Sequence, residues 1–210
     1  MPAVIDANDK HLNDAYGIVL PTAKHKDIRK VKKKHEPSVH GHKTWNASFV
    51  LMDYLLYNPI KPGARVLEIG CGWGPAAMFC AKQFDAQVTG LDIDPAVFPY
   101  MEVVAKLNKV KVTPLVSKFE KLTDEQLASF DVVIGSDICF WDELVKPLGK
   151  LINRALAAGV ERCIVTDPGR PTFFELCERT KKRHHAKHQD WYATDPRFFQ
   201  GDVLEVRAKS

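Results

Sequence analysis

A glycine-rich segment at residues 66–76, with the sequence VLEIGCGWGPA, holds the clearest chemical pattern in the chain. Gly70, Gly72 and Gly74 follow an apolar run directly, so the chain can turn tightly there and let a ligand approach its backbone. The helix expected to follow offers free N–H groups and the positive end of its dipole. The spacing differs from the dinucleotide fingerprint G-x-G-x-x-G, so a ligand other than a dinucleotide is indicated.

Carboxylates accompany this glycine loop on both sides. Glu68 stands two residues before Gly70, where it would repel a pyrophosphate and suit a cation such as an ammonium or a sulfonium. Asp92 ends the next apolar run, at the separation from the loop where an acid accepts hydrogen bonds from ribose hydroxyls. These residues predict a nucleoside ligand with a cationic tail.

The loop belongs to a series of apolar runs that alternate with amphipathic stretches, which predicts strands joined by helices. Such units require a parallel sheet with helices on both faces. The expected fold class is α/β: a doubly wound, mostly parallel seven-stranded Rossmann-like sheet with an antiparallel C-terminal edge hairpin. Pro99 is expected to disturb the first turns of its helix. Strands are expected at 64–70, 86–92, 111–117, 131–137, 160–167, 188–193 and 203–208, and helices at 44–58, 75–84, 95–108, 124–129, 142–156 and 172–182.

Length and composition indicate one globular domain. Of the 210 residues, 45% are hydrophobic and 27% charged, which is average for soluble chains and excludes a disordered or fibrous protein. We expect residues 44–210 to form the domain, and the polar, basic residues 1–43 to form an N-terminal arm with one short helix. Apolar runs are too short to span a membrane, and the first residues lack the hydrophobic region of a signal peptide. A cytoplasmic protein without membrane association is therefore expected.

Cysteines and histidines give no metal-binding pattern. The five cysteines include no C-x-x-C pair, which disfavours a disulfide framework or a zinc cluster, and Cys80, Cys163 and Cys177 are expected in the core. The histidines lack zincin spacing, so we expect no metal and a solvated setting for them. The histidines singled out here, among the eight of the chain, are His40, His42, His184, His185 and His188.

Basic residues gather at 24–35 and 179–188, and the rest of the chain carries a net negative charge. Two interpretations stay open for these basic strips. They are either solvated loops and helix faces or docking sites for an acidic partner or nucleic acid.

The glycine loop, together with GLDIDP at residues 90–95, resembles motifs I and II of the class I S-adenosylmethionine (SAM) methyltransferases. The resemblance covers about residues 44–210. It implies SAM as cofactor and S-adenosylhomocysteine as product. An NAD enzyme, or a glycine turn without a ligand, stays as an alternative. The cofactor-binding residues it implies are Glu68, Gly70, Gly72, Gly74, Asp92, Ser117 and Ser136.

Narrower features resemble the seven-β-strand protein-lysine methyltransferases, the group with the electron-transfer-flavoprotein β-subunit and calmodulin lysine methyltransferases. They are Thr44-Trp45, SDICFW at 136–141 and DPGR at 167–170. The resemblance implies that Trp45 lies against the cofactor and that Asp137 is the acid of the family's Asp-x-x-Tyr motif. The tyrosine of that motif is Phe140 here, so its hydroxyl is missing. The acid that commonly holds adenine after the third strand is also missing, because that position is Lys118.

The predicted methyl acceptor is a lysine side chain. Because the pKa of lysine is about 10.4, its amine must lose a proton before it attacks. Asp137 is placed to orient the ammonium or take that proton, although it is also placed to cap the next helix. Phe140 and Trp141 are candidates for the substrate channel wall and for cation–π contacts, with ordinary core packing as the alternative.

The predicted function is SAM-dependent N-methylation of a lysine on a protein substrate, and the basic strips suit an acidic one. The alternatives are a small-molecule N-methyltransferase and a catalytically silent SAM-fold binding module. Nucleic acid as substrate is disfavoured, because base-amino methyltransferases typically carry an Asn/Asp-Pro-Pro-aromatic run where this chain has SDICFW. Oligomeric state is not predicted.

Overall fold

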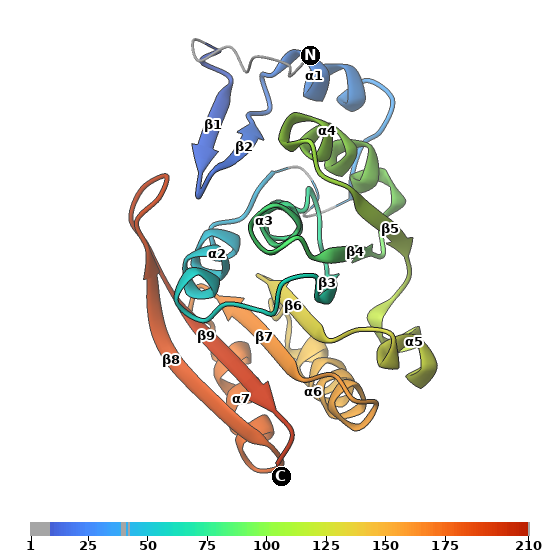
Figure 1. The fold of residues 1–210 in the computed structure, drawn as a ribbon, viewed down its shortest axis with the longest axis vertical. Coiled ribbons are helices and arrows are strands. Elements are labelled where there is room, and N and C mark those ends of the chain that lie inside the picture. Colours follow the sequence, from blue (N-terminus) through green and yellow to red (C-terminus); the bar gives the residue numbers. More distant parts are fainter. Residues whose placement is uncertain (1–8, 39–40, 42, 210) are drawn as a thin grey trace.

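The structure, a computed structural model, describes residues 9–38, 41 and 43–209. Its central feature is a seven-stranded sheet with the strand order β5-β4-β3-β6-β7-β9-β8 (Figure 1). The first five strands of that order run parallel, and β9 and β8 run antiparallel to their neighbours, which confirms the predicted fold class. The strands are β3 Arg65–Ile69, β4 Gln87–Asp92, β5 Val112–Val116, β6 Val132–Ser136, β7 Arg162–Asp167, β8 His185–Ala193 and β9 Phe199–Arg207.

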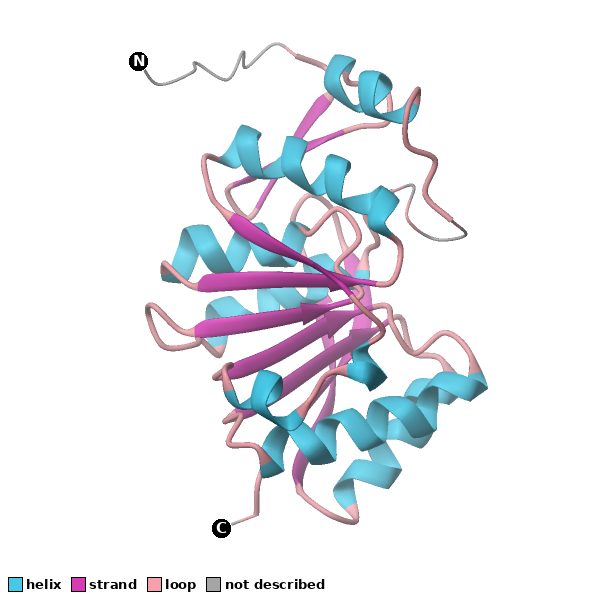
Figure 2. Cartoon of the chain, turned by 90° about the vertical axis from the view of Figure 1, so that its right-hand side faces the viewer, coloured by secondary structure: helices cyan, strands magenta, loops and turns pink. Residues whose placement is uncertain are grey.

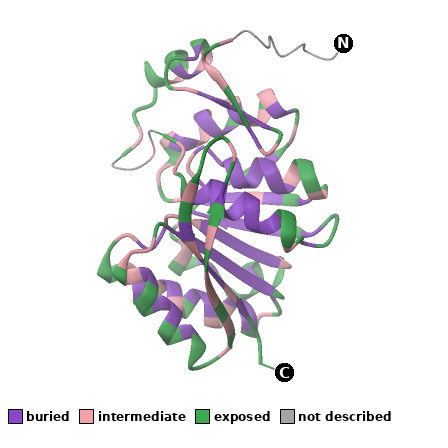
Figure 3. Cartoon of the chain, turned by 90° about the vertical axis from the view of Figure 1, so that its left-hand side faces the viewer, coloured by how far each residue is buried: buried purple, intermediate pink, exposed green. Residues whose placement is uncertain are grey.

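Helices cover both faces of this sheet (Figure 2). One face packs against α2 (Ala47–Tyr57), α3 (Pro75–Phe84) and α4 (Phe98–Asn108), and the other against α5 (Asp124–Ala128), α6 (Asp142–Ala157) and α7 (Pro171–Lys181). Each face has its own hydrophobic core, and the strands between them are largely buried (Figure 3). All predicted strands and helices occur with small shifts at their ends. The Pro99 helix begins after a 3₁₀ turn at η1 (Pro95–Val97), as expected.

The order of the strands creates a switch point between β3 and β6. From β3 the chain continues to β4 and β5 on one side, and then returns to place β6 and β7 on the other. The connections after β3 and β6 therefore diverge to opposite faces of the sheet. In open α/β sheets, ligands bind in the crevice at the carboxyl ends of such strands.

The N-terminal segment contains a β-hairpin that the sequence did not predict. Strands β1 (Leu12–Ala15) and β2 (Ile18–Pro21) pair through a turn at Tyr16 and Gly17, both with positive φ, and the expected short helix is α1 (Lys26–Lys32). Buried hydrophobic side chains of the hairpin join the core around α3 and α4. The Asn108 side chain on α4 accepts from the Val19 amide and donates to the Val19 carbonyl, both at 2.8 Å. The division of the chain at residue 43 stays a prediction.

Within the described residues, no helix is long and apolar enough to cross a membrane. All five cysteines are free and buried, so the expectation for Cys80, Cys163 and Cys177 is confirmed.

Candidate functional site

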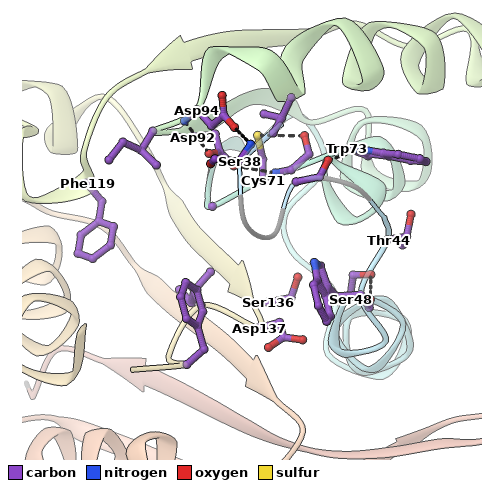
Figure 4. Close-up of a pocket in the computed structure, with 18 of the residues that line it drawn as sticks. Ser38, Thr44, Ser48, Cys71, Trp73, Asp92, Asp94, Phe119, Ser136 and Asp137 are labelled. Carbon is purple, nitrogen blue, oxygen red and sulfur yellow. Dashed lines mark hydrogen bonds between the residues drawn. The ribbon is translucent and has the colours of Figure 1, made fainter. Parts of the chain in front are cut away.

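A cavity of about 440 Å³ opens at the switch point, at the carboxyl ends of β3, β4 and β6 (Figure 4). We call it the first cavity. It gathers most of the residues singled out in the sequence, although they come from separate parts of the chain. Those that line it are Trp45, Gly70, Gly72, Asp92, Ser136, Asp137, Phe140 and Trp141. Glu68, Gly74 and Ser117 are not among the described residues that line it.

The glycine loop needs glycine for its backbone conformation. Gly70, Gly72 and Gly74 have φ values of +62°, +52° and +69°, which side chains rarely adopt. A Cβ on Gly70 would also lie 2.8 Å from Ile138 Cγ2. A Cβ on Gly72 would meet no described atom within 4 Å, so this part of the loop leaves room beside its backbone. Gly74 shapes the start of α3 rather than the cavity, because it is the residue before the helix.

Asp92 connects β4 to the glycine loop. Its carboxylate accepts from the Gly72 amide and from the Asp94 amide, both at 3.0 Å. Burial raises the pKa of Asp92, while these backbone hydrogen bonds oppose the rise. The contact with ribose predicted for Asp92 stays a prediction, and its position at the cavity wall is compatible with it.

Glu68 lies below the loop. Side chains alternate along β3, so Glu68 points to the same face as Val66, where α3 packs. Its carboxylate accepts from the Ala77 amide at 3.0 Å, in the first turn of α3. Glu68 is 1% exposed, and burial raises its pKa to about 8. The structure thus gives Glu68 a contact with the helix, and its predicted contact with the cofactor stays a prediction.

The residues that line the cavity near the end of β5 are not the ones expected from the sequence. Lys118, Phe119 and Glu120 line the cavity there, rather than Ser117, whose amide donates to the Asp92 carbonyl at 3.0 Å. Ile93 lies beside them and is 59% exposed. Ile93 and Phe119 offer apolar surface for a planar base, and Glu120 supplies an acid close to the position where the sequence lacked one. Their places directly after β4 and β5 were the signal that could have identified them.

The opposite end of the cavity is built around Asp137. Its φ is +59°, and its amide donates to the Thr166 carbonyl at 2.9 Å. The Arg170 guanidinium donates from Nη2 to Asp137 Oδ1 and, at 2.6 Å, to Asp167 Oδ2. The alternative that Asp137 caps the next helix is wrong, because α6 begins at Asp142 and Trp141 occupies the capping position.

Asp167 and Arg170 give Asp137 a charged support. Asp167 is fully buried, and its Oδ1 also accepts from the Gly169 amide at 3.0 Å and the Arg170 amide at 2.9 Å. Burial lowers the pKa of Arg170, but its hydrogen bonds to both carboxylates and their charges outweigh this effect and raise it. Of these three groups, Asp137 is the one among the described residues that lines the first cavity, so its carboxylate is the acidic group that the cavity presents at this end. Sequence analysis named Arg170 only as part of the DPGR segment and predicted no role for it.

Aromatic side chains form the mouth of the cavity beside Asp137. The rings of Phe140 and Trp141 meet edge to face, with centroids 4.8 Å apart. Trp141 is 54% exposed, so the alternative of an ordinary core position is wrong for it. The mouth therefore presents an aromatic surface to the solvent and to any large partner.

The segment before α2 forms another wall. Trp45 is half-buried, and Lys43 Nζ lies 4.1 Å from the centre of its ring. Trp73, in the glycine loop, also lines the cavity; its Nε1 donates to the Gly41 carbonyl at 2.9 Å, and its ring stacks on Tyr100. Sequence reasoning missed Trp73, which ties the N-terminal segment to the loop.

No group of three His, Cys, Asp or Glu side chains in the described part of the chain could hold a metal ion. Histidines 40 and 42 lie outside the described residues. The expectation of solvated histidines is wrong for His184 and His188, which are half-buried. His184 Nε2 lies 2.6 Å from Asn153 Oδ1 because α6 packs against α7, which His184 follows, and His188 Nε2 lies 2.7 Å from Asp202 Oδ1 because β9 pairs with β8.

The residues of the first cavity fit SAM. Its volume is in the range of small-molecule sites. The space beside Gly72, the acid at Asp92 and the apolar surface of Ile93 and Phe119 suit a nucleoside, and the negative charge around Asp137 suits cationic chemistry.

Comparisons with known proteins agree with this fit. Residues 66–159 match the family described as a methyltransferase domain. Over 130 residues the chain is 30% identical to the electron transfer flavoprotein beta subunit lysine methyltransferase of Xenopus laevis, covering 61% of this chain and 52% of that protein. Over 131 residues it is 32% identical to the ubiquinone biosynthesis O-methyltransferase of Xanthomonas campestris, covering 62% and 50%. The chain thus spans about half the length of these relatives.

Solved structures share the fold. Magnesium protoporphyrin IX methyltransferase from Synechocystis, solved with bound S-adenosylhomocysteine, aligns with a TM-score of 0.58 at 16% identity, over 87% of this chain and 93% of that one. TrmN from Thermus thermophilus aligns with a TM-score of 0.60 at 16% identity, over 77% and 49%. The sheet order and these alignments show that the chain has the α/β Rossmann-like fold of these methyltransferases, and residues 66–159 match a methyltransferase domain.

Proposed function

We propose that the protein is a SAM-dependent protein-lysine N-methyltransferase. The observation that carries this proposal is the Asp137–Arg170–Asp167 cluster, which presents negative charge beside an exposed aromatic mouth. A lysine side chain combines a cationic end with an apolar stem, so it matches both features. The flavoprotein β-subunit lysine methyltransferases among the relatives support the same substrate class.

The chain's own residues have to bind the acceptor and remove a proton from it. When bound, SAM supplies an electrophilic methyl group on a sulfonium with a good leaving group. Asp137 attracts the lysine ammonium, holds Nζ in the direction of attack and takes the proton that Nζ must lose. Arg170 fixes the carboxylate of Asp137 through its hydrogen bond to Oδ1.

The aromatic residues at the mouth assist deprotonation. Phe140 and Trp141 shield the lysine stem from water, and desolvation lowers the pKa of an amine. Their ring faces also attract the ammonium while it is still charged, by about 0.5–2 kcal/mol. Since reactant alignment alone contributes about 7–11 kcal/mol, a positioned acid and an aromatic wall are sufficient protein machinery.

A small-molecule acceptor is the second candidate, supported by the ubiquinone O-methyltransferases among the relatives. The decisive experiment follows radioactive methyl from SAM into a cell extract with the purified protein. We expect label in acid-precipitated protein and, after hydrolysis of that protein, in methylated lysine. Label confined to the small-molecule filtrate would favour the second candidate. SAM binding without transfer to any fraction would indicate the silent binding module.

A further inference from the structure

A second cavity of about 420 Å³ lies directly beside the first. Lys43, Thr44 and Trp73 line both, so a wall of these side chains separates them. The remaining lining comes from Asn13 of β1, the end of β2 and the residues after it, the start of α2 and the β8–β9 connection. It includes Leu20, Thr22, Asn46, Phe49, Arg197 and Phe199.

The two cavities differ in charge. Among the described residues that line the second cavity, the charged side chains are Lys43 and Arg197, both cations. The first cavity has Lys43 and Lys118 against four acids, which are Asp92, Asp94, Glu120 and Asp137.

The cations of the second cavity are available to an anion. Neither Lys43 nor Arg197 has a carboxylate within 4.0 Å in the part of the chain that the structure describes. Each lies over an aromatic ring: Lys43 Nζ is 4.1 Å from the centre of Trp45, and Arg197 Cζ is 5.0 Å from that of Phe199. A ring face orients a cation without neutralising it, so both keep their charge for a ligand.

The arginine side of the cavity is held by contacts between distant segments. The Tyr16 amide, at the turn of the β1–β2 hairpin, donates to Asp195 Oδ2 at 2.5 Å. The Tyr16 hydroxyl donates to Asp53 Oδ2 at 2.8 Å, and Trp191 Nε1 donates to Asp53 Oδ1 at 2.9 Å. Burial and the Asp53 hydrogen bond raise the pKa of Tyr16 to about 12, so it stays a donor. The β8–β9 connection therefore reaches the hairpin turn in a defined position (Figure 1).

We propose that the second cavity binds a carboxylate side chain of the protein substrate, near the acceptor lysine in sequence. This inference rests on the proposed function. Because Lys43, Thr44 and Trp73 line both cavities, the second cavity is within reach of the substrate chain on either side of a lysine bound in the first, and a carboxylate in it would meet Lys43 and Arg197. The basic strip at 24–35 begins directly after Ala23, which lines the second cavity, so it would attract the same acidic surface.

A carboxylate fits better than a nucleic acid. Nucleic-acid binding depends on many phosphate contacts, whereas this cavity offers two cations among its described lining residues. The acids of the first cavity would also repel a phosphate backbone next to it.

The test uses the full chain and peptides with one central lysine flanked by glutamine. A single glutamate replaces glutamine at each position from about four residues before the lysine to about four after it. The measured quantity is the ratio of kcat/KM for each glutamate peptide to that of the all-glutamine peptide. We expect a ratio of about 5 at one position or two adjacent ones, as for an ion pair at a partly exposed site.

Variants at position 197 locate the effect. Arg197→Met should bring the ratio close to 1, and Arg197→Glu should transfer the preference to a peptide with arginine at the same position. The matched control is Arg183→Met, which removes another exposed arginine without a carboxylate partner among the described residues and should leave the ratio unchanged.

Each contrary outcome has a separate meaning. Equal kcat/KM values for all peptides would overturn the inference but leave lysine methylation intact. A preference that persists undiminished in Arg197→Met would show that Arg197 does not bind the carboxylate, which also overturns the inference. If neither the peptides nor any protein in an extract accepts methyl from bound SAM, the proposed function fails, and this inference fails with it.

Discussion

The cofactor end of the first cavity is made mainly by one contiguous stretch, residues 66–94, with Phe119 and Glu120 added after β5, whereas the acceptor end is made by side chains at the ends of two strands, β6 and β7. At the cofactor end, the conformation of the glycine loop and the Gly72 amide donating to Asp92 define the surface. At the acceptor end, Asp137 follows β6 but depends on Asp167, the last residue of β7, and on Arg170 after it. The first end therefore depends on local backbone geometry, and the second on an ion-pair arrangement across the sheet.

This difference separates what substitutions at each end should change. A distorted backbone at the cofactor end weakens cofactor affinity and can be offset by more SAM. A lost charge at the acceptor end removes a group that acts on the acceptor, so saturating SAM cannot restore the rate. Affinity for SAM and kcat are accordingly the measurements that test the comparison.

Asp137→Asn should have the largest effect. Asparagine keeps the size of the side chain and an oxygen acceptor for Arg170, but it loses the charge and the capacity to take a proton. We expect kcat for methyl transfer to fall by about 10²–10⁴-fold, with a Kd for SAM within about twofold of wild type. Glu143→Gln, which removes an exposed acid of α6, is the control and should match wild type. Normal transfer by Asp137→Asn would exclude Asp137 from catalysis.

Gly70→Ala should produce the converse result. An alanine at position 70 has to adopt a φ of +62° and clashes with Ile138, at a combined cost of about 2–4 kcal/mol. The loop relieves part of this strain by moving into the cofactor site. We expect the Kd for SAM to rise by at least about tenfold and kcat at saturating SAM to change little. Gly63→Ala is the matched control, because Gly63 also has a positive φ, +73°, but lies in a turn outside the first cavity. It should lower thermal stability alone; a raised Kd for SAM in Gly63→Ala would contradict this.

The difference between the cofactor end and the acceptor end also explains which parts of the structure could be predicted from the sequence. The strands, the helices and the cofactor end follow from short-range patterns, because Gly70, Gly72 and Asp92 lie within one strand–helix–strand unit. The ion pair of Asp137 and Arg170 joins residues 33 apart, and it exists only because β6 and β7 are neighbours. The resemblance to a known family identified the segments that contain Asp137 and Arg170, but it did not predict the contact between these two side chains.

Two further features could not be predicted for similar reasons. The β1–β2 hairpin has strands of four residues, and its backbone is stabilised by Asn108 from α4, which is distant in the sequence. The half-buried setting of His188 depends on Asp202 across the β8–β9 pair. The sequence pattern around the hairpin and around His188 does not reveal their distant partners, Asn108 and Asp202.

Glu68 tests whether a buried acid next to the loop supports the fold. Because burial raises its pKa from 4.5 to about 8, the folded protein keeps a proton over a pH range in which the unfolded chain has lost it. The free energy of unfolding should therefore fall as pH rises through that range. Glu68→Gln keeps an acceptor for the Ala77 amide and removes the titration. Relative to wild type, it should gain stability on the order of 4 kcal/mol between about pH 5 and about pH 9.

Urea unfolding of both proteins at each pH measures this gain. Glu143→Gln, an exposed acid in the same buffers, should show none. A constant difference between Glu68→Gln and wild type would show that the carboxyl is ionised throughout. A simultaneous rise in the Kd for SAM would instead support the cofactor contact that the sequence predicted for Glu68.

Arg170→Lys should give the smallest effect and the finest test of the acceptor end. Lysine keeps the positive charge but cannot bridge Asp137 and Asp167 with the fixed fork of a guanidinium. If Arg170 acts by positioning, kcat should fall by about tenfold, and the Kd for SAM should stay unchanged. If its charge alone matters, Arg170→Lys should retain nearly full kcat while Arg170→Met loses it.

The pH profile separates positioning from a general loss of structure. A carboxylate that loses its guanidinium partner has a higher pKa, so the acidic limb of the kcat profile of Arg170→Met should move to higher pH. A variant that is only less well folded would lose amplitude without that displacement. Arg179→Met, which removes an arginine paired with Glu175 on the exposed side of α7, should leave both kcat and the profile unchanged. A displaced limb in Arg170→Met alone would show that the DPGR arginine governs the charge state of the acid at the end of β6.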